Sequence, residues 1–286
     1  MDNLKAKKRH PEEIAVYSAI YVCAAFSVLL LLGIIIYVFA KGARRVNWAF
    51  LTGVTSILHG TVGIAGNILN TLIIILLTMI ITTPIGVGAA IYLNEYAKPG
   101  KLVTVIIFAT ETLAGIPSII FGLFGMLFFG QLSHMGYSLL TGSLTLTLMV
   151  LPLVTRNTQE ALKTVPDSFR TGAVGLGAGK WYTIRTILLP SAMPGIVTGV
   201  ILAIGRIIGE SAALLFTAGS AHLLPKTFDA FLEKIFHSGG TLTIQLYLSA
   251  SKGEFEVAFG IAVVLLVIVL LINFGTKRLA KKLEKH

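Results

Sequence analysis

The stretch MPGIVTGVILAIGRIIGESAALLFT, from Met193 to Thr217, is apolar except for Arg206, Glu210 and a few small polar residues. The hydrocarbon core of a bilayer requires about 20 apolar residues in a helix, so this stretch is long enough to span a membrane. A charge near the centre of such a helix costs roughly 2.5–3.5 kcal/mol on insertion-based scales. Charges that persist at this depth usually face a partner or a water-filled path. The stretch therefore indicates part of a transport route.

The composition of the whole chain supports a membrane protein. Of its 286 residues, 55% are hydrophobic and only 13% are charged, whereas soluble domains have about 25% charged residues. The single cysteine, Cys23, excludes disulfides and cysteine-based metal sites within one chain, and we expect no metal site. The net charge of +10 is explained by loops that face anionic lipid, so we expect contact with the bilayer and none with nucleic acid.

The hydrophobic pattern predicts an all-α polytopic fold with six transmembrane helices. We expect the first helix at residues 14–40, after a cytoplasmic N-terminus of residues 1–13. The other five fall within a domain of residues 66–275, at 68–93, 102–129, 139–158, 193–217 and 257–275. The remaining parts of the chain are two long loops and a basic tail, at 159–190, 218–256 and 276–286.

Lysine and arginine residues predict how these helices are oriented. With six spans both termini lie on one side, and that side receives sixteen of the 23 Lys and Arg residues. The opposite side receives only Lys41, Arg44, Arg45, Lys226, Lys234 and Lys252. Because cytoplasmic loops carry the excess of positive charge, we expect both termini and the loop 159–190 to be cytoplasmic.

The loop 159–190 contains a spaced pattern of small and apolar residues: Thr171, Gly172, Ala173, Gly177, Ile187, Leu189 and Pro190. The last five form A–x3–G–x9–I–x–L–P, which resembles the EAA loop through which ABC importer permeases dock on their ATPase. Thr171 stands where the family has its glutamate, and Gly172 where it has its first alanine. The resemblance implies an ABC importer type I permease fold, with these seven positions coupling to the ATPase. The alternative is an ordinary amphipathic loop helix.

The same loop has a glycine-rich run that does not fit a nucleotide site. Residues 175–180 read Gly-Leu-Gly-Ala-Gly-Lys. A P-loop requires G-x4-G-K followed by Ser or Thr, but Val174 replaces the first glycine and Trp181 replaces the hydroxyl residue. We therefore expect no cofactor in this chain, with ATP and Mg²⁺ held by a partner ATPase.

A second block narrows the resemblance. Arg206, followed by Gly-Glu-Ser-Ala-Ala-Leu-Leu-Phe-Thr-Ala-Gly at 209–219, resembles the signature of the PstA family of phosphate importer permeases. Residues 114–119 and 90–96 fit the same family. The resemblance implies import of inorganic phosphate across the cytoplasmic membrane by alternating access. It also implies a second, PstC-like permease, two copies of a PstB-like ATPase and an external, PstS-like phosphate-binding protein.

The charges placed at depth are the candidate pathway residues, namely Arg206, Glu210 and Glu111, and Thr217 ends the block. On a continuous helix, residues four apart share a face, so we expect Arg206 and Glu210 to pair. In one interpretation Arg206 offers its fork of donors to passing phosphate, and Glu210 holds Arg206 between passages. In the other, the two form a structural ion pair. We expect Glu111 at a contact between helices, pairing with Arg206.

Three alternatives remain open at this point. The first keeps the class of protein but changes its assignment, to a permease of the sister PstC family or to one for phosphonate or another oxyanion. An ion-coupled secondary transporter is a different class, although the sequence shows no convincing internal repeat of the kind common in such folds. A membrane enzyme is the third, but no Ser/His/Asp, HExxH or paired-carboxylate spacing supports it, so we expect no catalytic residues.

Overall fold

The computed structural model describes residues 11–56, 61–225 and 227–283. In chain order its elements are α1 (Pro11–Gly42), η1 (Ala43–Arg45), α2 (Trp48–Thr52), β1 (Val54–Ser56), β2 (Thr61–Ile64), α3 (Ala65–Ile91), η2 (Tyr92–Tyr96), α4 (Lys101–Gly115), α5 (Ser118–Gly125), η3 (Met126–Leu132), α6 (Leu139–Lys163), α7 (Asp167–Gly175), α8 (Lys180–Thr183), η4 (Ile184–Leu188), α9 (Leu189–Gly209), α10 (Ala212–Thr217), α11 (Phe228–Glu233), η5 (Lys234–Phe236), α12 (Leu242–Ser251) and α13 (Phe255–Leu283).

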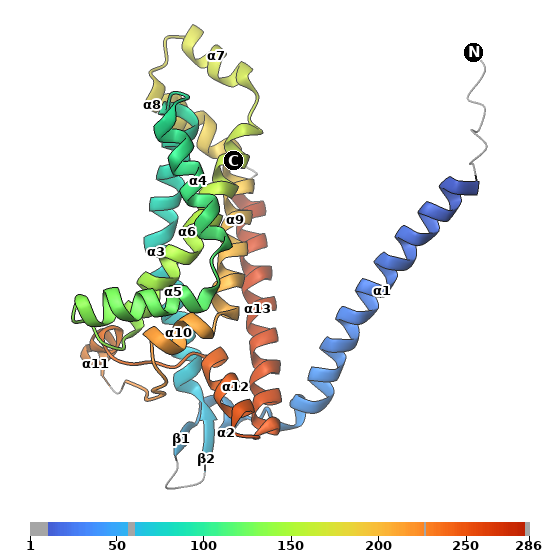
Figure 1. Cartoon of the computed structure of the whole chain (residues 1–286), viewed down its shortest axis with the longest axis vertical. Coiled ribbons are helices and arrows are strands. Elements are labelled where there is room, and N and C mark those ends of the chain that lie inside the picture. Colours follow the sequence, from blue (N-terminus) through green and yellow to red (C-terminus); the bar gives the residue numbers. More distant parts are fainter. Residues whose placement is uncertain (1–10, 57–60, 226, 284–286) are drawn as a thin grey trace.

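The fold is a bundle of membrane-spanning helices. Within the described residues, five helical stretches are long and apolar enough to cross a membrane, and the bent pair α4–α5 makes a sixth if it counts as one span. The first described stretch of chain holds α1, and Figure 1 shows this helix diverging from the rest of the bundle. One feature was absent from the predicted all-α fold: β1 and β2 form a short antiparallel hairpin, with Val54 opposite Ile64.

The centre of the bundle is the packing of α3 and α9 against α6. Small residues allow these helices to approach closely. A Cβ atom on Gly86 of α3 would lie 2.9 Å from Val154 of α6, and one on Gly199 of α9 would lie 2.6 Å from Asn157 of α6. The core of the bundle is therefore held by backbone proximity as well as by buried Leu, Ile and Val side chains.

The expected span at 102–129 is wrong as a single helix. The helix α4 ends at Gly115, and the chain then bends by 103° into α5 and η3. Pro117 explains the break, because the residue before a proline avoids the helical region, and Ile116 is extended at φ −72° and ψ 132°. Figure 1 shows α5 lying across the bundle, close to α10, and a Cβ on Gly122 of α5 would lie 2.8 Å from Ala213 of α10.

Two other expected spans have different limits. The helix expected at 139–158 continues to Lys163 in α6. The helix expected at 193–217 begins at Lys180, because α8, η4 and α9 form one stretch of 30 residues, and it ends at Gly209. Glu210 is extended at φ −81° and ψ 125° and separates α9 from α10. The helix continues through Pro190 and Pro194, the second of which lies inside α9, because membrane helices tolerate proline where neighbouring groups satisfy the freed backbone.

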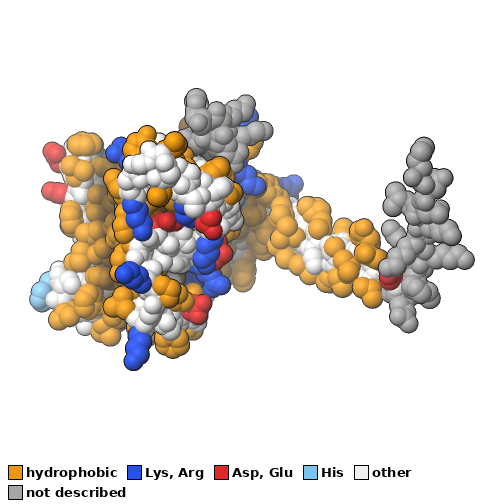
Figure 2. All heavy atoms as spheres, turned by 90° about the horizontal axis from the view of Figure 1, so that it is seen from above, with side chains coloured by type: hydrophobic (Ala, Val, Ile, Leu, Met, Phe, Trp, Pro, Cys, Tyr) orange, Lys and Arg blue, Asp and Glu red, His pale blue; other side chains and the backbone are white. Residues whose placement is uncertain are grey.

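The two ends of the bundle differ in character. Figure 1 places α7 and the end of α13 at one end, and the β1–β2 hairpin and α12 at the other. Viewed from the α7 end, Lys and Arg side chains gather on this surface with fewer acidic ones, whereas α1 is mainly apolar (Figure 2). The helix α13 continues through the expected tail to Leu283. Residues 1–10 of the expected N-terminus and residues 284–286 of the tail lie outside the described residues.

Candidate substrate pathway and coupling site

Glu210 does not pair with Arg206, so this prediction was wrong. The i, i+4 argument requires an unbroken helix, and α9 ends between the two residues, at Gly209. Glu210 is buried, and its Oε1 atom accepts a hydrogen bond from the backbone N–H of Ala213 at 3.0 Å. Its carbonyl oxygen accepts a further hydrogen bond from the hydroxyl of Thr243 at 2.8 Å. Glu210 therefore joins the start of α10 to α12.

Thr217, expected on the pathway, is also buried. Its hydroxyl donates to the carbonyl of Ala213 at 2.8 Å, within α10. Its own carbonyl accepts a hydrogen bond from the backbone N–H of Ser138, the residue before α6. The polar groups of Thr217 are thus used inside the protein, and they connect α10 to the start of α6.

Arg206 and Glu111 do lie around one space, and the structure adds Arg156 to them. A cavity of about 170 Å³ between α4, α6 and α9 is lined by Thr110, Glu111, Ala114, Met149, Pro152, Leu153, Arg156 and Arg206. Among the residues that the structure describes, no ion pair within 4 Å involves Arg156, Arg206 or Glu111. Two guanidinium groups and one carboxylate therefore face the cavity without direct pairing.

A second cavity borders the first on the α7 side. It has a volume of about 270 Å³ and is lined by Leu93, Ile107, Thr110, Glu111, Arg156, Gln159, Glu160 and Lys163. Thr110, Glu111 and Arg156 line both cavities. Of its other charges, Lys163 and Glu160 pair with each other at 3.0 Å. We refer to the two cavities together as the arginine cavity; its unpaired charges leave a net positive charge of one.

Sequence reasoning missed Arg156 as a pathway residue. It lies near the end of the span expected at 139–158 and was counted only among the charges of the cytoplasmic side. The structure continues α6 to Lys163, so Arg156, Gln159, Glu160 and Lys163 recur at three- and four-residue spacing on one helix face. This spacing is visible in the sequence and is the signal that identifies the face.

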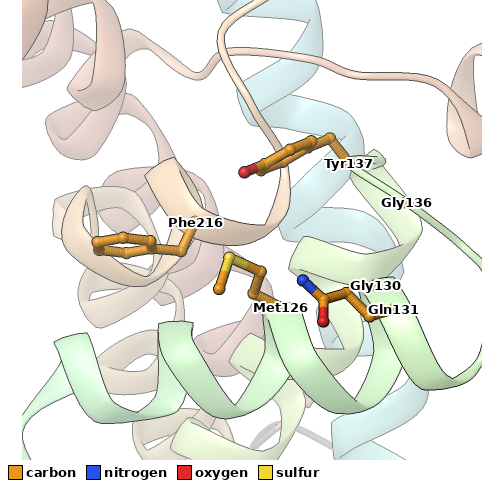
Figure 3. A pocket seen from close by; sticks show the side chains of 6 residues that line it. All are labelled: Met126, Gly130, Gln131, Gly136, Tyr137 and Phe216. Atoms are coloured by element: carbon orange, nitrogen blue, oxygen red, sulfur yellow. The ribbon is translucent and has the colours of Figure 1, made fainter.

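A third cavity lies nearer the other end of the bundle, between η3 and α10. Its volume is about 90 Å³, and it is lined by Met126, Gly130, Gln131, Gly136, Tyr137 and Phe216. In Figure 3 the side chains of Met126, Phe216 and Tyr137 surround a common space, with Gln131 at its edge. The lining is mainly apolar and contains no charged residue. It is therefore a poor site for an anion compared with the arginine cavity.

The expected ATPase-coupling residues separate into two groups. Thr171, Gly172 and Ala173 lie on α7, and Gly177 follows in the turn after it. The φ of Gly177 is +78°, a conformation that favours glycine. Ala173 faces inward and is buried, whereas Leu176 is 91% exposed at the tip of the turn.

Ile187, Leu189 and Pro190 lie elsewhere, inside the helix that runs from Lys180 to Gly209. Leu189 packs against an internal cluster of buried side chains, which includes its neighbour Leu188 and Ile184. These three residues are separated from α7 by the turn at Gly177. The structure therefore places the small residues of α7 at the tip of the molecule and the Ile-x-Leu-Pro segment at the base of a membrane helix.

Arg170 of α7 was not singled out in the sequence, although it has the densest set of side-chain contacts at this end. Its guanidinium donates to Glu95 Oε1 of η2, with Nη2 at 2.9 Å and Nε at 3.3 Å. The hydrogen bond that Arg170 donates to Glu95 is the main reason that the pKa of Arg170 is raised above its usual value. The first turn of α7 therefore contains a fixed cation, and its partner comes from the end of α3.

The fold and these sites define a class of protein, the membrane-spanning subunit of a type I ABC importer. Residues 82–286 match the family model described as "Binding-protein-dependent transport system inner membrane component", and the chain belongs to this family. It is 35% identical to the "Probable ABC transporter permease protein YqgI" of Bacillus subtilis (strain 168), over 92% of this chain and 93% of that protein.

Another relative is the "Phosphate transport system permease protein PstA" of Xylella fastidiosa (strain Temecula1). It is 34% identical, over 84% of this chain and 82% of that protein. The fold also resembles a chain in the crystal structure of a bacterial alginate ABC transporter in complex with its alginate-bound periplasmic protein, with a TM-score of 0.70 over 96% of each chain. That chain is 14% identical, so the likeness shows the fold alone.

Proposed function

We propose that this chain is a permease subunit of an ATP-driven importer of inorganic phosphate, of the PstA type rather than the sister PstC type. The observation that supports it best is the arginine cavity, in which Arg156 and Arg206 face a common space without direct ion pairs. A relative that is 34% identical over most of the chain is named as a phosphate transport permease. Its PstA designation favours PstA over PstC.

The chemistry of the cavity suits a transported oxyanion. A guanidinium presents several N–H donors in a planar fork that matches the oxygens of phosphate. Two such groups around one cavity can hold phosphate from two sides, while Glu111 on the same cavity repels it. This repulsion limits how tightly phosphate binds, which a transport route needs because the ion has to leave again. No covalent chemistry is required of this chain.

The transport cycle is alternating access at an interface with a second, homologous permease. Two copies of an ATPase, which hold ATP and Mg²⁺, dock on α7 and the turn at Gly177, and an external binding protein delivers phosphate at the opposite end. Closure of the ATPases on ATP opens the pathway outward, and hydrolysis returns it to the inward-facing state. In this arrangement the end that carries α7 is cytoplasmic, and both termini lie on that side.

Uptake of labelled phosphate tests the proposal. The chain is expressed with its partner subunits in a host that lacks its own importer of this type, at low micromolar phosphate. We expect uptake that requires ATP and is competed by arsenate. In Arg206→Gln the loss of charge-assisted hydrogen bonds, about 1.5–3 kcal/mol, reduces uptake by roughly tenfold to a hundredfold while the complex still assembles.

Arg185→Gln is the matched control, because Arg185 is an exposed arginine of the same continuous helix and does not line the arginine cavity. Uptake should remain near wild type in this variant. Uptake of phosphonate in place of phosphate, by a complex that hydrolyses ATP, would assign a different oxyanion. Phosphate uptake that persists without the ATPase would place the chain among ion-coupled transporters instead.

A further inference from the structure

Arg170 joins three parts of the chain through one side chain. Besides its two hydrogen bonds to Glu95, its Nη2 donates to the carbonyl of Leu162 at 3.1 Å, and its Nη1 donates to the carbonyl of Val165 at 3.0 Å. Nη1 also donates to Asp167 Oδ1 at 3.0 Å. Glu95 lies on η2, at the end of α3. The carbonyl of Leu162 lies at the end of α6, and that of Val165 lies just after it. A residue of α7 is therefore bound to the ends of two central helices.

The two acidic partners of Arg170 differ in their surroundings. The side chain of Glu95 is 8% exposed and that of Arg170 is 23% exposed, whereas the side chain of Asp167 is 92% exposed. Exposed ion pairs contribute little because water and salt screen them. Breaking a sheltered pair is costly, because the remaining charge stays unpaired. The ion pair with Glu95 therefore contributes more to holding Arg170 in place than the ion pair with Asp167. The exposed pair with Asp167 can serve as a control for the sheltered one.

The rest of α7 is weakly attached to the bundle. Ala173 is its only buried residue among those described, and Phe169, Val174 and Leu176 are exposed. Next to α7, Lys180 lies 4.6 Å from the centre of the Tyr96 ring, a second contact that reaches η2. Arg170 supplies the side-chain hydrogen bonds that join α7 to η2 and to the end of α6.

We infer that the Glu95–Arg170 pair is the link that carries movement of α7 into α3. This inference rests on the proposed function, in which the ATPases dock on α7. Glu95 lies on η2, which continues α3, and α3 packs against α6 through Gly86. A displacement of α7 therefore reaches the helices that flank the arginine cavity, since α6 contributes Arg156 to it. Glu95 and Arg170 are positioning residues and do not contact the transported ion.

The complete transporter in liposomes, with both permeases, the ATPases and the binding protein, tests this inference. Two ratios are measured: phosphate taken up per ATP hydrolysed, and the stimulation of ATP hydrolysis by the loaded binding protein. We expect Glu95→Gln to lower both by about tenfold, because a sheltered ion pair is broken. The amount of ATPase that co-purifies and the basal hydrolysis should stay unchanged.

Asp167→Asn is the matched control, since it removes the exposed partner of the same arginine; both ratios should stay within about twofold of wild type. Arg170→Lys keeps the charge but loses the fork, so it should give intermediate ratios. Unchanged ratios in Glu95→Gln, or an equal loss in Asp167→Asn, would overturn the inference. So would a failure of both Glu95→Gln and Arg170→Lys to assemble, because the role would then be structural.

The two proposals fail in different ways in this experiment. If the wild-type transporter does not take up phosphate but its ATP hydrolysis is still stimulated by its binding protein, the cargo is wrong and the link is still tested by the second ratio. If wild-type phosphate transport is coupled normally and Glu95→Gln behaves like wild type, phosphate remains the proposed transported ion. The Glu95–Arg170 pair is then excluded as the link between α7 and α3.

Discussion

Arg170 and Arg206 show two opposite uses of the same side chain. Arg170, outside the membrane-spanning part, donates to two carboxylates and two backbone carbonyls. Arg206, within the last turn of α9, lines a cavity and has no ion-pair partner within 4 Å among the described residues. A guanidinium whose donors are all used holds a structure together. One whose donors remain free near a cavity is available to a ligand.

The acidic residues follow the same division. Glu95 and Glu210 are used internally, the first as the partner of Arg170 and the second at the start of α10. Glu111 faces the arginine cavity and has no such partner in the part of the chain that the structure describes. Loss of an internally bonded carboxylate, such as Glu95 or Glu210, should damage coupling or stability. Loss of the unpaired carboxylate of Glu111 should change the passage of the ion itself.

The largest effect that tests this division is expected at Arg156. In Arg156→Gln the cavity loses one of two guanidinium groups, and uptake at limiting phosphate should fall by roughly tenfold to a hundredfold. Basal ATP hydrolysis should persist, since Arg156 is not among the residues to which Arg170 of α7 is hydrogen-bonded. Initial rates of labelled phosphate uptake measure the effect. Wild-type uptake in this variant would show that Arg156 of α6 does not act on the pathway. Arg206 would then be the only arginine of the cavity proposed to bind phosphate.

A smaller effect is expected in the turn after α7. In Gly177→Trp a bulky side chain is placed at φ +78°, which costs about 1–3 kcal/mol in backbone strain and adds volume at the tip. We expect the amount of co-purified ATPase to fall several-fold. Gly177→Asn is the control, because asparagine tolerates this conformation and is small. Full retention of the ATPase by the Trp variant would contradict docking at this turn.

The smallest effect is expected at Glu111. Glu111→Gln removes the repulsion between this carboxylate and phosphate in the arginine cavity, so phosphate should bind more tightly and leave more slowly. We expect KM and the maximal uptake rate both to decrease, each by about twofold. Saturation curves of uptake separate the two quantities. An increase in KM would instead indicate that Glu111 orients the arginines.

Much of the architecture was predictable because burial in lipid leaves a strong local signal. Long apolar runs must form helices in a bilayer, where each backbone polar group has to be satisfied. The class of protein was also predictable, from the pattern around Ala173 and Gly177 and the block that begins at Arg206. The bend at Pro117 has a local cause as well, although the expected span was drawn straight through it.

The sequence alone therefore determined the class of protein, five of the six expected membrane helices and the candidate charge Arg206. Only the tertiary structure decided the partners of the charges. Nothing local predicts that Thr243 donates to the carbonyl of Glu210, or that Arg170 reaches Glu95, which lies 75 residues earlier in the chain. Hydrophobic patterns act over one helix and are readable from neighbouring residues, whereas the pairing of charges depends on which helix ends meet after the bundle has packed.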